Sequence, residues 1–127
     1  MLIKKSNSIV YCKKFQETVS FYKDLIGLEV TFSKSWFVEF KLTESSFISI
    51  VDENRATIKS CSGKGITISL NVENIYHERE LFIEKGINPT ALKEIWGSLH
   101  FFVHDPEGTR IEFWEEISVT KREKKSS

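Results

Sequence analysis

Apolar and polar positions along the chain predict a strand, a helix and three further strands in the first half. Residues from Ser8 to Cys12 read as a short apolar strand, and apolar spacing predicts a helix from Phe15 to Leu25. Gly27 follows the last apolar turn of this helix and suits a left-handed helix end. The strands that follow are predicted at 28–32, 36–42 and 47–51.

The second half repeats this order about 60 residues further along the chain. A strand is predicted at 66–72 and a helix at 75–85, and Gly86 ends this helix as Gly27 ends the first. The remaining strands are predicted around 89–92, at 99–104 and at 110–115. One such βαβββ module is too short to bury a core alone, so the two modules should pair.

The predicted fold class is therefore α+β, with two paired βαβββ modules forming a curved mixed sheet around a cleft and helices on the outer face. We expect a single domain over residues 1–120, with module 1 at about 5–52, a linker at 53–64 and module 2 at about 65–117. Residues 118–127 include a short basic run and are expected to form a disordered tail.

The strand at 66–72 carries apolar residues on one face and polar residues on the other. Ile66, Ile68, Leu70 and Val72 alternate with Thr67, Ser69 and Asn71. The apolar face should pack on the helices. We expect the opposite face to be joined by Tyr11, Phe102 and Trp114, because their strands pair with this one. A half-polar, half-aromatic concavity is typical of a small-molecule site.

Composition and charge exclude several classes of function. The 127 residues are 40% hydrophobic and 13% aromatic, and 18 basic residues balance 18 acidic ones. A net charge of zero provides no long-range field for nucleic acid or an anionic membrane, so neither is an expected partner. Cys12 and Cys61 form no CxxC pair, which argues against a metal clip or redox motif. Without a signal peptide or an apolar run of spanning length, we expect a cytoplasmic protein.

Two motifs lie near the ends of the repeat: VSFYKDLIGLEV from Val19 to Val30, and DPEGTRIE from Asp105 to Glu112. Together with the doubled order of elements, they resemble the vicinal oxygen chelate superfamily. That superfamily includes glyoxalase I, extradiol dioxygenases, fosfomycin-resistance enzymes and bleomycin-resistance proteins. Trp96-Gly97, followed by Phe102 and the Asp-Pro-x-Gly turn, resembles its drug-binding members, which are metal-free dimers that sequester antibiotics in aromatic clefts.

The resemblance also implies where metal ligands would lie in the metal-using members. The matching positions in this chain are Asn7, Ser49, Thr67 and Glu112. One carboxylate, one amide and two hydroxyls are a poor set for zinc, nickel or iron. We therefore expect no metal and no cofactor, and the resemblance to the enzymes weakens accordingly.

Six residues are the candidates for a site. Glu112 is a carboxylate on an otherwise apolar strand. It either binds a cationic group of a ligand or acts as a general base, or it is a relic of the metal site that pairs with a neighbouring hydroxyl or Arg. His100 either points toward Glu112 as an acid–base partner or is only hydrogen-bonded. The aromatic residues either contact a ligand, with Tyr11 as a hydrogen-bond donor, or fill the core and a dimer interface. These aromatic candidates are Tyr11, Trp96, Phe102 and Trp114.

The sequence thus favours a homodimer that binds a small organic molecule without metal, such as a toxic compound or antibiotic that it sequesters. The first alternative is a glyoxalase- or dioxygenase-like lyase or isomerase that uses Glu112, with a non-standard metal site or none. The second is a regulatory or partner-binding module with no ligand in its cleft.

Overall fold

The computed structural model describes residues 1–117, and the tail expected at 118–127 lies outside the described residues. The chain divides into two compact units. The first comprises Met1–Gly65 together with Asp105–Thr109, and the second comprises Ile66–His104 and the described residues from Arg110 on.

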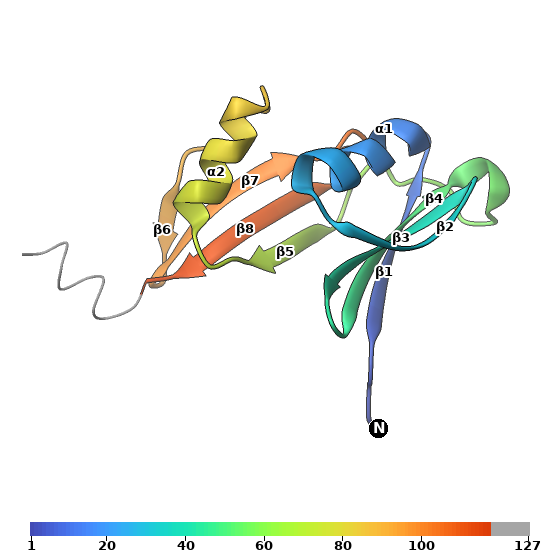
Figure 1. The fold of residues 1–127 in the computed structure, drawn as a ribbon, viewed down its shortest axis with the longest axis horizontal. Helices are drawn as coiled ribbons and strands as arrows, with labels where there is room; N and C mark the ends of the chain where they lie inside the picture. The colour runs from blue at the N-terminus through green and yellow to red at the C-terminus, as the bar shows by residue number, and fades with distance from the viewer. Residues whose placement is uncertain (118–127) are drawn as a thin grey trace, which may run out of the picture. The chain divides into compact units, whose positions relative to one another are not determined.

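The first unit is a four-stranded mixed sheet with a helix on one face (Figure 1). The strand order is β1-β4-β3-β2, in which β1 runs parallel to β4 and the other neighbours are antiparallel. The elements in chain order are β1 (Ser6–Cys12), α1 (Phe15–Ser20), η1 (Phe21–Ile26), β2 (Glu29–Lys34), β3 (Phe37–Thr43), β4 (Ser46–Asp52) and the short 3₁₀ helix η2 (Glu53–Arg55).

The second unit repeats this topology. Its strand order is β5-β8-β7-β6, with β5 parallel to β8, and α2 packs on β7 and β8 (Figure 1). The elements are β5 (Thr67–Asn71), α2 (Ile75–Glu84), β6 (Lys93–Ile95), β7 (Ser98–His104) and β8 (Arg110–Glu116). The predicted α+β class and the two βαβββ modules are confirmed.

Two elements differ from the sequence prediction. The helix predicted from Phe15 to Leu25 is α-helical only to Ser20 and continues as the π-helix η1, which ends at Gly27 with the expected left-handed conformation (φ 82°). The strand predicted around 89–92 is wrong, because β6 begins at Lys93. Pro89 has no N–H to donate to a ladder, and Thr90 instead bonds to the backbone of Phe102.

Alternation along the central strands places the core of each unit between sheet and helix. In β8, Ile111 and Phe113 are buried and Phe113 packs on Phe82 of α2, while Glu112 and Trp114 face the other way. In β4, Ile48 and Ile50 share one face and are buried, and Ser49 between them is buried as well. The predicted division of β5 into an apolar and a polar face follows the same rule.

The loop Asp105–Thr109 belongs to the first unit, although the strands on either side of it belong to the second. Its Gly108 lies against Gly63 so closely that a Cβ on Gly63 would stand 2.2 Å from the Gly108 carbonyl carbon. A Cβ on Gly108 would in turn stand 2.8 Å from the Ser62 carbonyl oxygen, and both glycines have positive φ, so both positions favour glycine.

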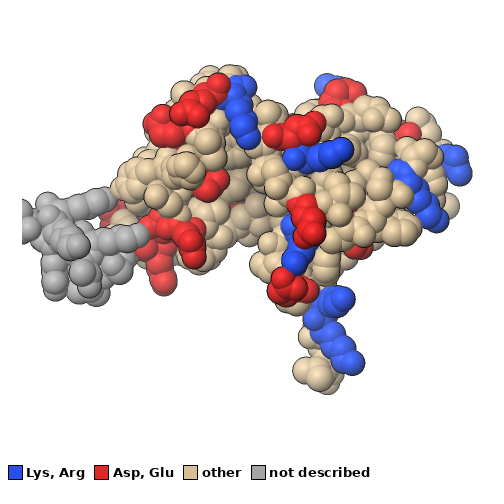
Figure 2. All heavy atoms as spheres, in the orientation of Figure 1, with Lys and Arg blue, Asp and Glu red and all other residues tan. Residues whose placement is uncertain are grey.

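On the visible face of the first unit, basic and acidic side chains are interspersed, and neither kind forms a broad patch (Figure 2). Among the described helices, none is long and apolar enough to cross a membrane.

Candidate functional site

The open side of the second sheet, opposite α2, carries a row of polar and aromatic side chains that we call the polar face. The strand register brings its members together: Glu112 lies between Ser69 and Phe102, Trp114 between Asn71 and His100, and Arg110 between Thr67 and His104. The polar face is defined by Thr67, Ser69, Asn71, His100, Phe102, His104, Arg110, Glu112 and Trp114.

Glu112 is held at the centre of the polar face by its neighbours on β5 and β7. The Ser69 hydroxyl donates to Oε1 at 2.6 Å, and Nδ1 of His100 lies 3.3 Å from Oε2. The second approach does not have hydrogen-bond geometry, and Nδ1 is a buried polar atom without a hydrogen bond among the described residues. Because 21% of the Glu112 side chain is exposed, the carboxylate remains accessible.

His100 also stacks on Trp114. Their ring centroids are 6.4 Å apart and the planes are inclined by 19°. Both side chains are half-buried, so the pair presents aromatic surface on the open side of the sheet. An imidazole parallel to an indole, beside a carboxylate, can stack on a flat ligand and also exchange a proton with it.

Arg110 lies at one end of the polar face and is fixed by two contacts. Its Nε donates to the Thr67 hydroxyl at 2.8 Å, and its guanidinium carbon stands 4.5 Å from the centroid of the Phe102 ring. Sequence analysis missed this residue. An Arg two positions before Glu112 on the same strand was the available signal, since alternate strand residues share a face.

The structure brings together four of the six predicted site residues: His100, Phe102, Glu112 and Trp114 all lie on the polar face. The prediction that the strand of Tyr11 pairs with the strand at 66–72 is wrong, because Tyr11 lies in the first unit on β1, opposite Val51 of β4. Trp96 stands at the turn between β6 and β7 and is fully exposed. Its φ of 48° is uncommon for a large side chain and marks the turn.

The four positions that match metal ligands do not suit a divalent ion. In the first unit, the Ser49 hydroxyl donates to Oδ1 of Asn7 at 3.0 Å, so these two groups bond to each other. In the second, Thr67 accepts from the cationic Arg110, whose charge would repel a metal near that hydroxyl. No three His, Cys, Asp or Glu side chains within residues 1–117 are grouped as a metal site requires.

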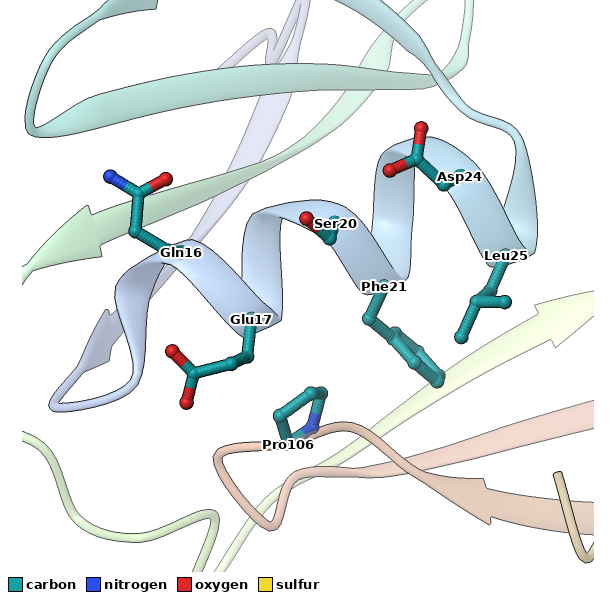
Figure 3. A pocket seen from close by; sticks show the side chains of 7 residues that line it. All are labelled: Gln16, Glu17, Ser20, Phe21, Asp24, Leu25 and Pro106. Carbon is teal, nitrogen blue, oxygen red and sulfur yellow. The ribbon is translucent and has the colours of Figure 1, made fainter.

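A hollow of about 480 Å³ lies elsewhere, on the first unit (Figure 3). Phe21 and Leu25 leave the helix on the side of Pro106, while Gln16 and Asp24 point away from it. The hollow is open and mostly apolar, and no predicted site residue lines it. Its polar groups do not converge on one point, so we place the site on the polar face. The lining residues are Gln16, Glu17, Ser20, Phe21, Asp24, Leu25 and Pro106.

A second cluster of carboxylates, which we call the loop cluster, lies within the first unit and consists of Asp105 and Glu107 with their donors. Asp105 Oδ2 accepts from the Tyr22 hydroxyl at 2.7 Å, and Oδ1 accepts from the backbone N–H of Glu107 and Thr109 at 2.9 Å. Glu107 accepts from the backbone N–H of Lys13 and Lys14 at 2.9 Å and from the Ser60 hydroxyl.

The ionisation of the loop cluster follows from its burial and bonding. Burial raises the pKa of Asp105, against the hydrogen bonds that it accepts. Partial burial also acts to raise the pKa of Glu107, but donation from Ser60, Lys13 and Lys14 outweighs it and lowers that pKa. Burial raises the pKa of the nearby Cys12 thiol to about 12, so Cys12 is no nucleophile at neutral pH. The loop cluster is therefore structural.

No protein-family model matches the sequence, and the search of curated proteins found no match. Solved structures do match in fold. A glyoxalase/bleomycin resistance protein/dioxygenase from Nocardioides gives a TM-score of 0.75 at 14% identity, covering 94% of this chain and 85% of that one. This chain has the fold of the glyoxalase/bleomycin-resistance/dioxygenase proteins. The superfamily resemblance drawn from the two sequence motifs is thereby confirmed at the level of the fold.

Two further structures with this fold differ in what they do. Lactoylglutathione lyase from Agrobacterium tumefaciens gives a TM-score of 0.71 at 16% identity, covering 87% of this chain and 91% of that one. TnmS3, an antibiotic binding protein from Streptomyces sp. CB03234, gives 0.75 at 13% identity, covering 91% and 96%. The glyoxalase-like fold thus serves both an enzyme and a binding protein, and the function must be argued from the site.

Proposed function

We propose that this protein binds a small organic molecule on the polar face without a metal, and that it sequesters the molecule rather than transforming it. The observation that carries this proposal is the stacked pair of His100 and Trp114 beside the tethered carboxylate of Glu112. Aromatic surface next to a few fixed polar groups is the usual composition of a small-molecule site. The antibiotic binding protein of the same fold supports a binding role.

The metal-independent part of the proposal rests on donor chemistry. Asn7 and Ser49 satisfy each other, and Thr67 bonds to a cation, so three of the four family positions are engaged without a metal. Two cysteines without a disulfide agree with the reducing cytoplasm predicted from the sequence. The predicted homodimer stays part of the proposal, and sedimentation of the purified protein would test it.

The test of binding is a pair of tryptophan variants. Trp114→Ala should weaken binding of a flat aromatic probe, such as 2-naphthamide, by ~1–3 kcal/mol, because stacking on the indole is lost. Isothermal titration calorimetry measures the affinity. Trp36→Ala is the matched control, since Trp36 contacts Phe37 in the first unit, and it should leave the affinity unchanged. Equal losses in both variants, or none in Trp114→Ala, would reject the polar face as the site.

A second candidate function is metal-free acid–base catalysis, as in a lyase or isomerase. The observation that favours it is the 3.3 Å approach of His100 Nδ1 to Glu112 Oε2, since Nδ1 is buried and forms no hydrogen bond among the described residues. Glu112→Gln keeps the shape of the side chain but removes the base. If it abolishes turnover of a substrate that it still binds, the protein is an enzyme; if no turnover exists to lose, sequestration stands.

A further inference from the structure

The most exposed charge on the polar face is the cation of Arg110, and the carboxylate of Glu112 is exposed only in part. Glu112 is tethered by Ser69 through one oxygen and faces His100 with the other. Arg110, by contrast, is exposed. Its partners in register on the neighbouring strands are Thr67 and His104, neither of which carries a negative charge. Within residues 1–117, Arg110 forms no ion pair with a carboxylate.

The two contacts of Arg110 fix its guanidinium without using up its donors. Nε donates to Thr67, and the plane is supported by the ring of Phe102 at 4.5 Å. Within the described part of the chain, neither terminal nitrogen forms a hydrogen bond, and together they match the two oxygens of a carboxylate. A guanidinium that is held in place in advance loses less freedom when it binds an anion, so it recognises one more strongly than a free surface Arg does.

The strand register places Phe102, which the guanidinium covers, beside the aromatic pair. Phe102 lies opposite Glu112, and Trp114 lies two residues further along β8. Two residues of a strand span about 7 Å. A flat ring on Trp114 and His100 would therefore place an acidic substituent of that ring near the guanidinium over Phe102.

We propose that the ligand of this site is a flat organic anion, whose ring stacks on Trp114 and whose carboxylate or similar oxyanion is bound by Arg110. This inference rests on the proposed binding function and adds the chemical class of the ligand. It assigns Arg110 as the residue that selects the anion.

Three probes with one ring system and different charges test the inference: 2-naphthoate, 2-naphthamide and 2-naphthylmethylammonium. Calorimetry at low ionic strength should show naphthoate binding about tenfold or more tightly than the amide, because a charge-assisted hydrogen bond contributes at least that factor. The ammonium probe should bind more weakly than the amide. Arg110→Gln should remove the preference for naphthoate and change amide binding by less than about twofold.

The matched control is Arg55→Gln. Arg55 also lies over an aromatic ring, at 5.7 Å from the centroid of Trp36, but in the first unit, so naphthoate affinity should not change. Arg110→Lys is a second variant that keeps the charge and should retain part of the preference. Because Arg110 is exposed, both variants at this position should fold, and their thermal transitions would verify it.

The outcomes separate the two proposals. If all three probes bind equally and depend on Trp114, the choice of an anion is wrong while binding on the polar face stands. A preference for naphthoate that survives Arg110→Gln would also overturn the assignment of Arg110. If none of the probes binds the wild-type protein, the proposed binding function itself fails, and the inference fails with it.

Discussion

Asp105 and Glu107 in the loop cluster are buried, and each accepts hydrogen bonds at both of its carboxylate oxygens. Glu112 on the polar face is partly exposed and accepts a hydrogen bond at only one oxygen among the described residues. The donors of the loop cluster are mostly backbone N–H groups, which cannot turn away to meet a ligand. The donor to Glu112 on the polar face is a side-chain hydroxyl, that of Ser69. The difference separates a carboxylate that stabilises the fold from one that remains accessible to a ligand.

Glu107 also binds the backbone that leads into α1. No side chain caps α1 at Lys14, and the carboxylate of Glu107 accepts from the N–H groups of Lys13 and Lys14 instead. In the second unit, Asn74 caps α2 with its own side chain, and Glu115 accepts from the N–H of Ile75. A carboxylate that is distant in sequence thus binds backbone N–H groups at the start of each helix. The start of α2 also has a side-chain cap from Asn74, whereas the start of α1 has none.

The largest expected effect is the loss of stability in Glu107→Ala. Two backbone donors and the Ser60 hydroxyl would lose a charged acceptor, which should lower the free energy of unfolding by ~2–4 kcal/mol. Glu112→Ala, which removes a single bond from an exposed hydroxyl, should cost less than ~1 kcal/mol. Urea denaturation measures the free energy of unfolding of both variants. Equal losses of stability would contradict the proposed difference between the loop cluster and the polar face.

Tyr22→Phe should have the next largest effect. It leaves Oδ2 of the buried Asp105 without its hydroxyl donor, at a cost of ~1–2 kcal/mol in the free energy of unfolding. Tyr11→Phe, in the same unit, serves as the control and should change stability by less than ~0.5 kcal/mol. If the two variants have the same free energy of unfolding, the hydrogen bond between Tyr22 and Asp105 makes no net contribution to stability.

The pH dependence of stability offers a finer comparison. Because the folded-state pKa of Glu107 is lowered from 4.5, its ionised form stabilises the fold above that pH, and this contribution is lost as the pH falls through the lowered value. Asp105 acts in the opposite sense, since its pKa is raised from 3.8: its contribution is lost as the pH rises through the raised value.

The stability difference between wild type and Glu107→Gln should therefore be constant near neutral pH and shrink as the pH falls below 4.5. Urea denaturation at a series of pH values measures this difference. A stability difference that stays the same down to the lowest pH measured would mean that the charge of Glu107 does not contribute to stability. Only the shape of its side chain would then matter.

Local patterns carried most of the fold prediction. Strand alternation and the two glycines that end the helices, Gly27 and Gly86, are short-range signals, and both glycines have positive φ as expected. The π-helix after Ser20 was missed because consecutive buried aromatics, Phe21 and Tyr22, are compatible with an ordinary helix in the sequence pattern. The start of β6 was missed because Pro89 to Leu92 is apolar without forming a ladder.

The candidate site was only partly predictable. His100, Phe102, Glu112 and Trp114 share a face because alternation along β7 and β8 requires it. The role of Glu107 depends on partners more than 90 residues away, which no local pattern contains. One signal was present, however: the Cys12-Lys13-Lys14-Phe15 segment offers no Ser, Thr, Asp or Asn to begin α1, so its cap had to come from elsewhere.

The most direct test of the central claim, that ligands bind on the polar face, is to follow the indole N–H signals of the three tryptophans by NMR during titration with 2-naphthoate. The chain has one tryptophan on the polar face, Trp114, one at an exposed turn, Trp96, and one in the first unit, Trp36. We predict that the Trp114 signal shifts with saturation while Trp36 stays in place. A shift confined to Trp36, or no shift at Trp114, would contradict the account.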